Sequence, residues 1–257
     1  EAARKRLSAI AITDHDGLYG IVRFAEAAAA HQIPTVFGAE LSLAPRAERT
    51  QWADPPGPHL LVLARGPEGY HRLASVLTES HLSSGEKGEA DYDLDELAQQ
   101  ADGHWVVLTG CRKGIVRSAL QGDCAPTAAQ VAQAGEALDS LVERFGADNV
   151  VVELFDLQQP LDSLHNDILF ELASQRGLRA VATGLVHYAT TSDDRLAQAM
   201  ASVRSRRSLD QMRPYLPPAP SGHIRSGTEQ LRRFARYPGV VEAAGKLGRE
   251  LAFPLRK

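Results

Sequence analysis

The string Thr13-Asp14-His15-Asp16-Gly17-Leu18-Tyr19-Gly20 places an imidazole between two carboxylates, directly after the apolar run Ala9-Ile10-Ala11-Ile12. A strand that ends in Asp-His and turns through glycine into a helix brings an acid and an imidazole to its C-terminal end. In parallel α/β folds, functional sites are built at that end of the sheet. The string alone is a modest signal, because Asp-His pairs also occur as ordinary turn residues, and His15 keeps that second interpretation.

Four further side chains of metal-binding type stand at the boundaries of expected strands, namely Glu40, His59, Cys111 and His187. Neutral imidazole, carboxylate and thiolate are the groups that bind first-row divalent metals. Strand ends that are far apart in the sequence converge on one mouth of a barrel, so no short ligand spacing is required. Together with His15, these residues form a candidate metal site.

Each of these residues also has a purely structural interpretation. Glu40 lies in the apolar stretch 36–43, where an unpaired charge would be very costly, and this favours a functional role. His59 could simply open a strand at the surface. Cys111 could be a small buried apolar residue, and His187 could be a histidine of the core.

The elements that would position these residues follow from apolar periodicity and turn signals. Strands are predicted at residues 8–13, 35–41, 59–64, 105–111, 150–154 and 179–183. Helices are predicted at 18–32, 67–80, from 93 onwards, and at 127–145, 162–176, 195–207, 228–237 and 239–250. Strands that alternate with helices predict a parallel α/β architecture. Six such units, with one expected to be lost before residue 1, favour a barrel over an open sheet.

The bulk composition is that of a globular α/β protein. The chain has 257 residues, of which 44% are hydrophobic and 23% charged, enough for one large or two small domains. Its net charge of −4 does not indicate the basic surface that is typical of nucleic-acid-binding proteins. Two cysteines without a CxxC pair indicate a reduced, cytoplasmic setting, and no apolar run approaches the ~20 residues of a membrane span.

Several motifs together resemble one family, the polymerase and histidinol phosphatase (PHP) domain at the N-terminus of C-family bacterial DNA polymerases, the DNA polymerase III alpha type. These motifs are the string 11–20 with Arg23-Phe24-Ala25-Glu26, then Val36-Phe37-Gly38-Ala39-Glu40, His59-Leu60-Leu61-Val62-Leu63-Ala64, Leu108-Thr109-Gly110-Cys111 and Val186-His187-Tyr188. Two segments are most similar to the error-prone branch of this family. They are the first motif and, near the end of the chain, Phe234-Ala235-Arg236-Tyr237-Pro238-Gly239.

The resemblance implies a distorted (β/α)7 barrel that lacks its first strand here and is followed by an α-helical segment. It implies metal ligands at His15, Glu40, His59, Cys111 and His187, with Asp14 in a supporting role. In family members with intact sites, such ligands hold two or three divalent metals and serve phosphoester hydrolysis or structural stability. The metal could be zinc, manganese or magnesium.

Two departures from the family pattern predict a degenerate site. The His-x-His of the opening strand is absent, because the chain begins after it. The aspartate expected two residues before His187 is Leu185, which cannot ligate a metal. We therefore expect a structural module with a residual metal site and no catalytic residues of its own.

On this interpretation, residues 1–190 are the PHP domain and residues 191–257 are a helical link to the polymerase body. The parent would be an error-prone DNA-directed DNA polymerase for damage-tolerant synthesis and repair, with its catalytic magnesium held beyond residue 257. Its partners would be DNA and other replication or mutagenesis proteins, with no membrane. The alternatives are a free-standing phosphoesterase of the histidinol-phosphatase type and a metal-free interaction scaffold.

Overall fold

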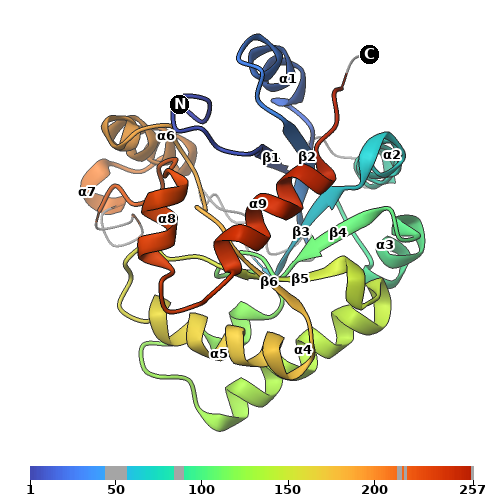
Figure 1. The fold of residues 1–257 in the computed structure, drawn as a ribbon, viewed down its shortest axis with the longest axis vertical. Coiled ribbons are helices and arrows are strands. Elements are labelled where there is room, and N and C mark those ends of the chain that lie inside the picture. Colours follow the sequence, from blue (N-terminus) through green and yellow to red (C-terminus); the bar gives the residue numbers. More distant parts are fainter. Residues whose placement is uncertain (44–56, 84–89, 213–215, 217–218, 256–257) are drawn as a thin grey trace.

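The computed structural model describes residues 1–43, 57–83, 90–212, 216 and 219–255. Its strands are β1 (Ile10–His15), β2 (Thr35–Ser42), β3 (His59–Ala64), β4 (Trp105–Leu108), β5 (Val150–Leu154) and β6 (Arg179–Ala182). Its α-helices are α1 (Ile21–Ala30), α2 (Gly66–Ser83), α3 (Leu94–Ala101), α4 (Ala128–Phe145), α5 (Asp162–Gln175), α6 (Asp194–Ser205), α7 (Leu209–Met212), α8 (Gly227–Arg233) and α9 (Val240–Leu251). Figure 1 shows the helices arranged around the sheet, with α9 crossing in front of it.

All six predicted strands and the long predicted helices are present, with shifted ends. The strand expected at 8–13 runs from Ile10 through His15, so His15 is a strand residue and not a turn residue. The strand expected to reach Cys111 ends at Leu108. The short helix α7 was not expected. The sequence also predicts a loop at 52–58, rich in proline and glycine, and an irregular proline-containing linker at 214–220. Most of both segments lies outside the described residues.

The sheet has the order β1-β2-β3-β4-β5-β6, which is an α/β fold with mostly parallel pairs. The predicted α/β architecture is confirmed, and the sheet departs from parallel pairing at β3, which runs antiparallel to both β2 and β4. A parallel neighbour needs a crossover connection that usually contains a helix. The sequence between β2 and β3 carries proline and glycine breakers and no helical period, which is consistent with their antiparallel pairing.

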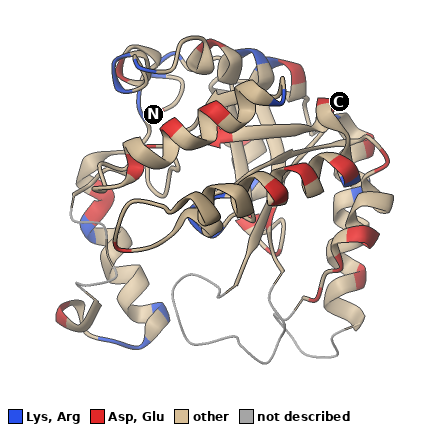
Figure 2. Ribbon diagram, turned by 90° about the horizontal axis from the view of Figure 1, so that it is seen from below, with Lys and Arg blue, Asp and Glu red and all other residues tan. Residues whose placement is uncertain are grey.

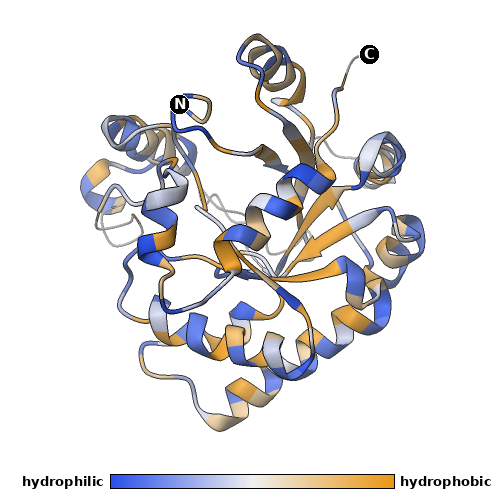
Figure 3. Ribbon diagram, in the orientation of Figure 1, coloured by the Kyte–Doolittle hydropathy of each residue, from blue (hydrophilic) through white to orange (hydrophobic). Residues whose placement is uncertain are grey.

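Two apolar layers lie on the two faces of the sheet. The inner layer lies inside the curve of the sheet and contains Val36, Leu63, Val106, Leu108, Val151 and Val181, together with Leu247 and Leu251 of α9. The outer layer joins the other face of the sheet to α2, α3, α4 and α5. Side chains alternate between faces along each strand, so near-continuous apolar strands are buried on both sides (Figure 3).

Helix α9 covers the end of the sheet where the parallel strands begin. The sequence places Val240, Val241, Ala244 and Leu247 on one apolar face of this helix. Leu247 lies in the inner layer, together with Leu251. Glu250 forms ion pairs with Arg65 at 2.8 Å and with Arg179 at 3.1 Å. Arg179 is the first residue of β6, so α9 lies at the end of the sheet opposite to the one where β1 and β2 finish.

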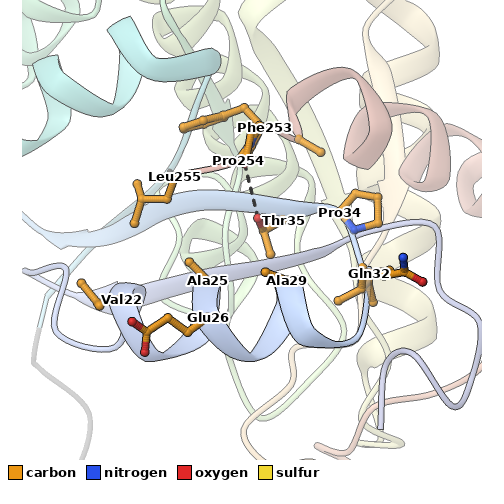
Figure 4. A pocket seen from close by; sticks show the side chains of 12 residues that line it. Val22, Ala25, Glu26, Ala29, Gln32, Pro34, Thr35, Phe253, Pro254 and Leu255 are labelled. Atoms are coloured by element: carbon orange, nitrogen blue, oxygen red, sulfur yellow. Dashed lines mark hydrogen bonds between the residues drawn. The ribbon is translucent and has the colours of Figure 1, made fainter. Parts of the chain in front are cut away.

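The chain after α9 packs against the outer face of β2. The Phe253 amide donates to the Thr35 carbonyl oxygen at 3.1 Å, and the Phe253 ring meets Phe37 edge-on with centroids 5.1 Å apart. Beside this segment, α1 and residues 252–255 line an apolar groove of about 390 Å³ (Figure 4). The groove therefore lies on the flank of the sheet, beside the start of β2.

Acidic and basic residues are interspersed over several of the described helices (Figure 2). Helix α5 is an exception, because it carries Asp162, Asp167 and Glu171 and no lysine or arginine. The described helices include none that combines the length and apolarity needed to cross a bilayer.

Candidate metal centre

The turn after β1 explains why the Asp-His-Asp string directs its histidine inward. Asp14 Oδ2 accepts a hydrogen bond from the Gly20 amide at 2.7 Å, which fixes the approach to α1. Asp16 adopts a left-handed conformation with φ 47°, a region that aspartate enters more readily than most residues. Asp16 Oδ1 accepts from the Ser42 amide at 2.8 Å and ties the turn to the end of β2. Both carboxylates are therefore used locally.

Three side chains from adjacent strands form one group. The ligand atoms of His15, Glu40 and His59 all lie within 4.8 Å of one another. His59 Nδ1 is 2.9 Å from Glu40 Oε1, and His15 Nε2 is 3.6 Å from Glu40 Oε2. The two imidazole rings meet edge-on, with centroids 5.1 Å apart. Each oxygen of the Glu40 carboxylate therefore faces a different imidazole.

The strand pairing places these three residues at one end of the sheet. His15 lies directly opposite Glu40 in the β1–β2 register, and His59 lies opposite Ser42. Because β3 is antiparallel, its first residue lies where β1 and β2 end. The His59 side chain is fully buried, so the structure does not support its interpretation as a surface residue that merely opens a strand.

Cys111 joins this group from the loop after β4. Its Sγ lies 3.3 Å from Glu40 Oε1 and 4.0 Å from His59 Nδ1, and it accepts a hydrogen bond from the Lys113 amide. Gly110, with φ 79°, provides the left-handed turn that brings Cys111 over the end of the sheet. Cys111 therefore extends the three-residue group on the side of Glu40 and His59.

His187 stands apart from the three-residue group in the described part of the chain. Its side chain is exposed, and its backbone amide donates to the Gly222 carbonyl oxygen at 2.8 Å. The preceding Leu185 has φ 42°, in the left-handed region that a leucine rarely adopts. A metal role for His187, as for the other four residues, remains a prediction.

The charge on Glu40 is favoured by its neighbours. Burial alone would raise the pKa of this carboxyl, but the hydrogen bond from His59 and the charges of His15 and His59 outweigh it. The pKa of Glu40 is therefore below its ordinary value. A carboxylate kept ionised between two imidazoles, with a thiol beside it, is a donor set that suits zinc or a similar divalent cation.

Glu153 is a residue of this region that the sequence reasoning missed. It lies within the apolar strand Val150-Val151-Val152-Glu153-Leu154 and is only 2% exposed. Burial, and to a smaller extent the charge of Glu40, raise its pKa to about 7 against the opposing hydrogen bond from Thr183. The signal was available, because a carboxylate inside an apolar strand is the same pattern that singled out Glu40.

Residues 1–156 match the sequence model described as the PHP domain, and the chain belongs to this family. It is 55% identical over 255 residues, or 99% of its length, to the error-prone DNA polymerase of Mycolicibacterium paratuberculosis. It is 54% identical over its whole length to the error-prone DNA polymerase of Mycobacterium tuberculosis strain H37Rv. The chain spans about 23% of the length of each of these relatives.

Among solved structures, the chain is similar to an amidohydrolase from Chromobacterium violaceum. The TM-score is 0.42 at 17% sequence identity, covering 70% of this chain and 78% of the other.

Proposed function

We propose that this chain is the N-terminal PHP-domain portion of an error-prone, DNA-directed DNA polymerase that acts in damage-tolerant synthesis and repair. The observation that carries the proposal is the 55% identity over 99% of the chain to a relative of that name. The substrate would be DNA in the bacterial cytoplasm, and other replication or mutagenesis proteins would be further partners. Residues 1–190 would form the PHP unit, and residues 191–257 would lead to the polymerase body.

Within that polymerase, the metal centre would be a structural site. His15, Glu40 and His59 come from three adjacent strands and would hold a zinc, manganese or magnesium ion, with Cys111 as a fourth ligand. A divalent cation bound there could supply Lewis-acid stabilisation to a phosphoester. Leu185 offers no anion where the family pattern has an aspartate, so we assign this site to holding the three strands together.

The proposal is tested by comparing this chain with the complete polymerase that contains it. Primer extension is measured with dNTPs and magnesium, on intact templates and on templates that carry a lesion. We expect extension by the complete protein on both templates and none by the chain alone. Extension by the homogeneous chain would place the polymerase carboxylates within residues 1–257 and would contradict the assignment.

A free-standing phosphoesterase is the second candidate, and the His15, Glu40 and His59 group is the observation that favours it. Its test is hydrolysis of histidinol phosphate and of a 3′-terminal DNA nucleotide by the chain loaded with zinc or manganese. Turnover that is lost in Glu40→Gln would support the phosphoesterase. We expect no turnover above that of the metal ion alone.

A further inference from the structure

Glu153 presents a buried carboxylate oxygen that has no hydrogen-bond partner among the described residues. Its Oε1 accepts a hydrogen bond from the Thr183 hydroxyl at 2.5 Å. Its Oε2 is fully buried and makes no such bond within the described part of the chain. A buried carboxylate without full compensation is costly, so this oxygen indicates a ligand that the protein alone does not provide.

The strand geometry directs Glu153 to the inside of the sheet, towards the metal centre. Val151, two residues earlier, belongs to the inner apolar layer, and residues two apart on a strand share a face. By the same count, Glu40 shares the inner face with Val36, and His59 shares it with Leu63. Glu153 and the three-residue group are therefore on one face, near the end where β1, β2 and β5 finish.

The buried cation Arg117 is committed to other partners. The Arg117 guanidinium donates to Asp162 at 2.7 Å and to Asn166 at 3.0 Å, and it stacks on the ring of Phe155. Glu153 forms no ion pair with any described residue. The charge of Glu40 is among the causes that raise the pKa of Glu153.

We propose that Glu153 is a further anionic ligand of the metal centre, contributed by β5 and reaching a divalent cation through Oε2, directly or through one water molecule. It would supply a negative charge to a site for which Leu185 provides none. Thr183, at the end of β6, would orient the carboxylate through its hydroxyl. This inference rests on the metal centre of the proposed function and adds a residue that no sequence motif assigns.

The test is the affinity of the chain for Zn²⁺ and Mn²⁺, measured by competition with a chromophoric chelator. Glu153→Gln keeps the size of the side chain and its hydrogen bond from Thr183 but removes the anion. We expect it to bind roughly 10–100-fold more weakly than the unmodified chain, the usual effect of losing a supporting ligand. Glu250→Gln, which removes one negative charge at the opposite end of the sheet, should bind as the unmodified chain does.

A second readout separates a contact at the metal from a general loss of stability. The visible absorption of bound Co²⁺ reports its ligand set, and it should change in Glu153→Gln but not in Glu250→Gln. If Glu153→Gln leaves affinity and spectrum unchanged while Glu40→Gln abolishes binding, the inference about Glu153 is wrong and the metal centre stands. If the unmodified chain binds no metal, or Glu40→Gln binds as tightly, both the centre and the inference are wrong.

Discussion

The substitution Glu153→Gln should stabilise the metal-free chain above about pH 7 and leave its stability nearly unchanged near about pH 5. Burial raises the pKa of Glu153 from 4.5 to about 7 in the folded state. Between those values the folded protein keeps a proton that the unfolded chain has released. The free energy of unfolding of the unmodified chain therefore falls as the pH rises through this window. Glutamine does not ionise, so the variant lacks this fall.

The size of the effect follows from the two pKa values. A rise from 4.5 to about 7 corresponds to roughly 3 kcal/mol, at about 1.4 kcal/mol for each pKa unit. Most of that loss occurs between about pH 5 and pH 8. The whole stability of a domain is about 5–15 kcal/mol, so the difference between the two proteins is measurable.

The assay is urea unfolding, followed by circular dichroism, across this pH range with a chelator present. Glu136→Gln, at an exposed position on α4, is the matched control and should follow the unmodified chain. Thr183→Val removes a hydrogen bond that lowers the pKa of Glu153, so the fall in its stability should extend to higher pH. Parallel pH profiles for the unmodified chain and Glu153→Gln would refute the reasoning, because they would show that Glu153 titrates alike in the folded and unfolded states.

Three further outcomes are expected. Arg117→Met leaves the buried Asp162 carboxylate without its ion-pair partner. It should lower the free energy of unfolding, measured by urea titration, by about 3–5 kcal/mol. A loss below about 1 kcal/mol would contradict a buried ion pair. Leu247→Ala removes a contact of α9 with the inner layer and should lower the free energy of unfolding by about 2–5 kcal/mol. Leu196→Ala, at a side chain that is 65% exposed, should lower it by less than about 0.5 kcal/mol. Equal losses in the two variants would mean that α9 does not close the sheet. Adding Zn²⁺ should raise the melting temperature of the unmodified chain but not that of His15→Ala, and an equal rise in both would exclude His15 from the site.

The sequence alone determined the elements and part of the site. Apolar runs and helical spacing depend on neighbouring residues, so the strands and the long helices could be predicted from the chain, as could the apolar face of α9. His15 and Glu40 could also be identified, because a histidine at a strand end and a carboxylate in an apolar strand are local patterns. Leu185 could be recognised in the same way, because it is a leucine at a position where the family pattern has an aspartate.

The tertiary structure decided which of these residues meet. The reversed direction of β3 brings His59, the first residue of its strand, to the end where His15 and Glu40 lie. A turn beyond β4 brings in Cys111, whereas His187 is exposed and outside the three-residue group. Strand direction and side-chain burial depend on contacts between residues that are distant in the sequence. For that reason periodicity could place each residue on its strand but could not show that the buried Glu153 shares a face of the sheet with Glu40, or that α9 closes the opposite end of the sheet.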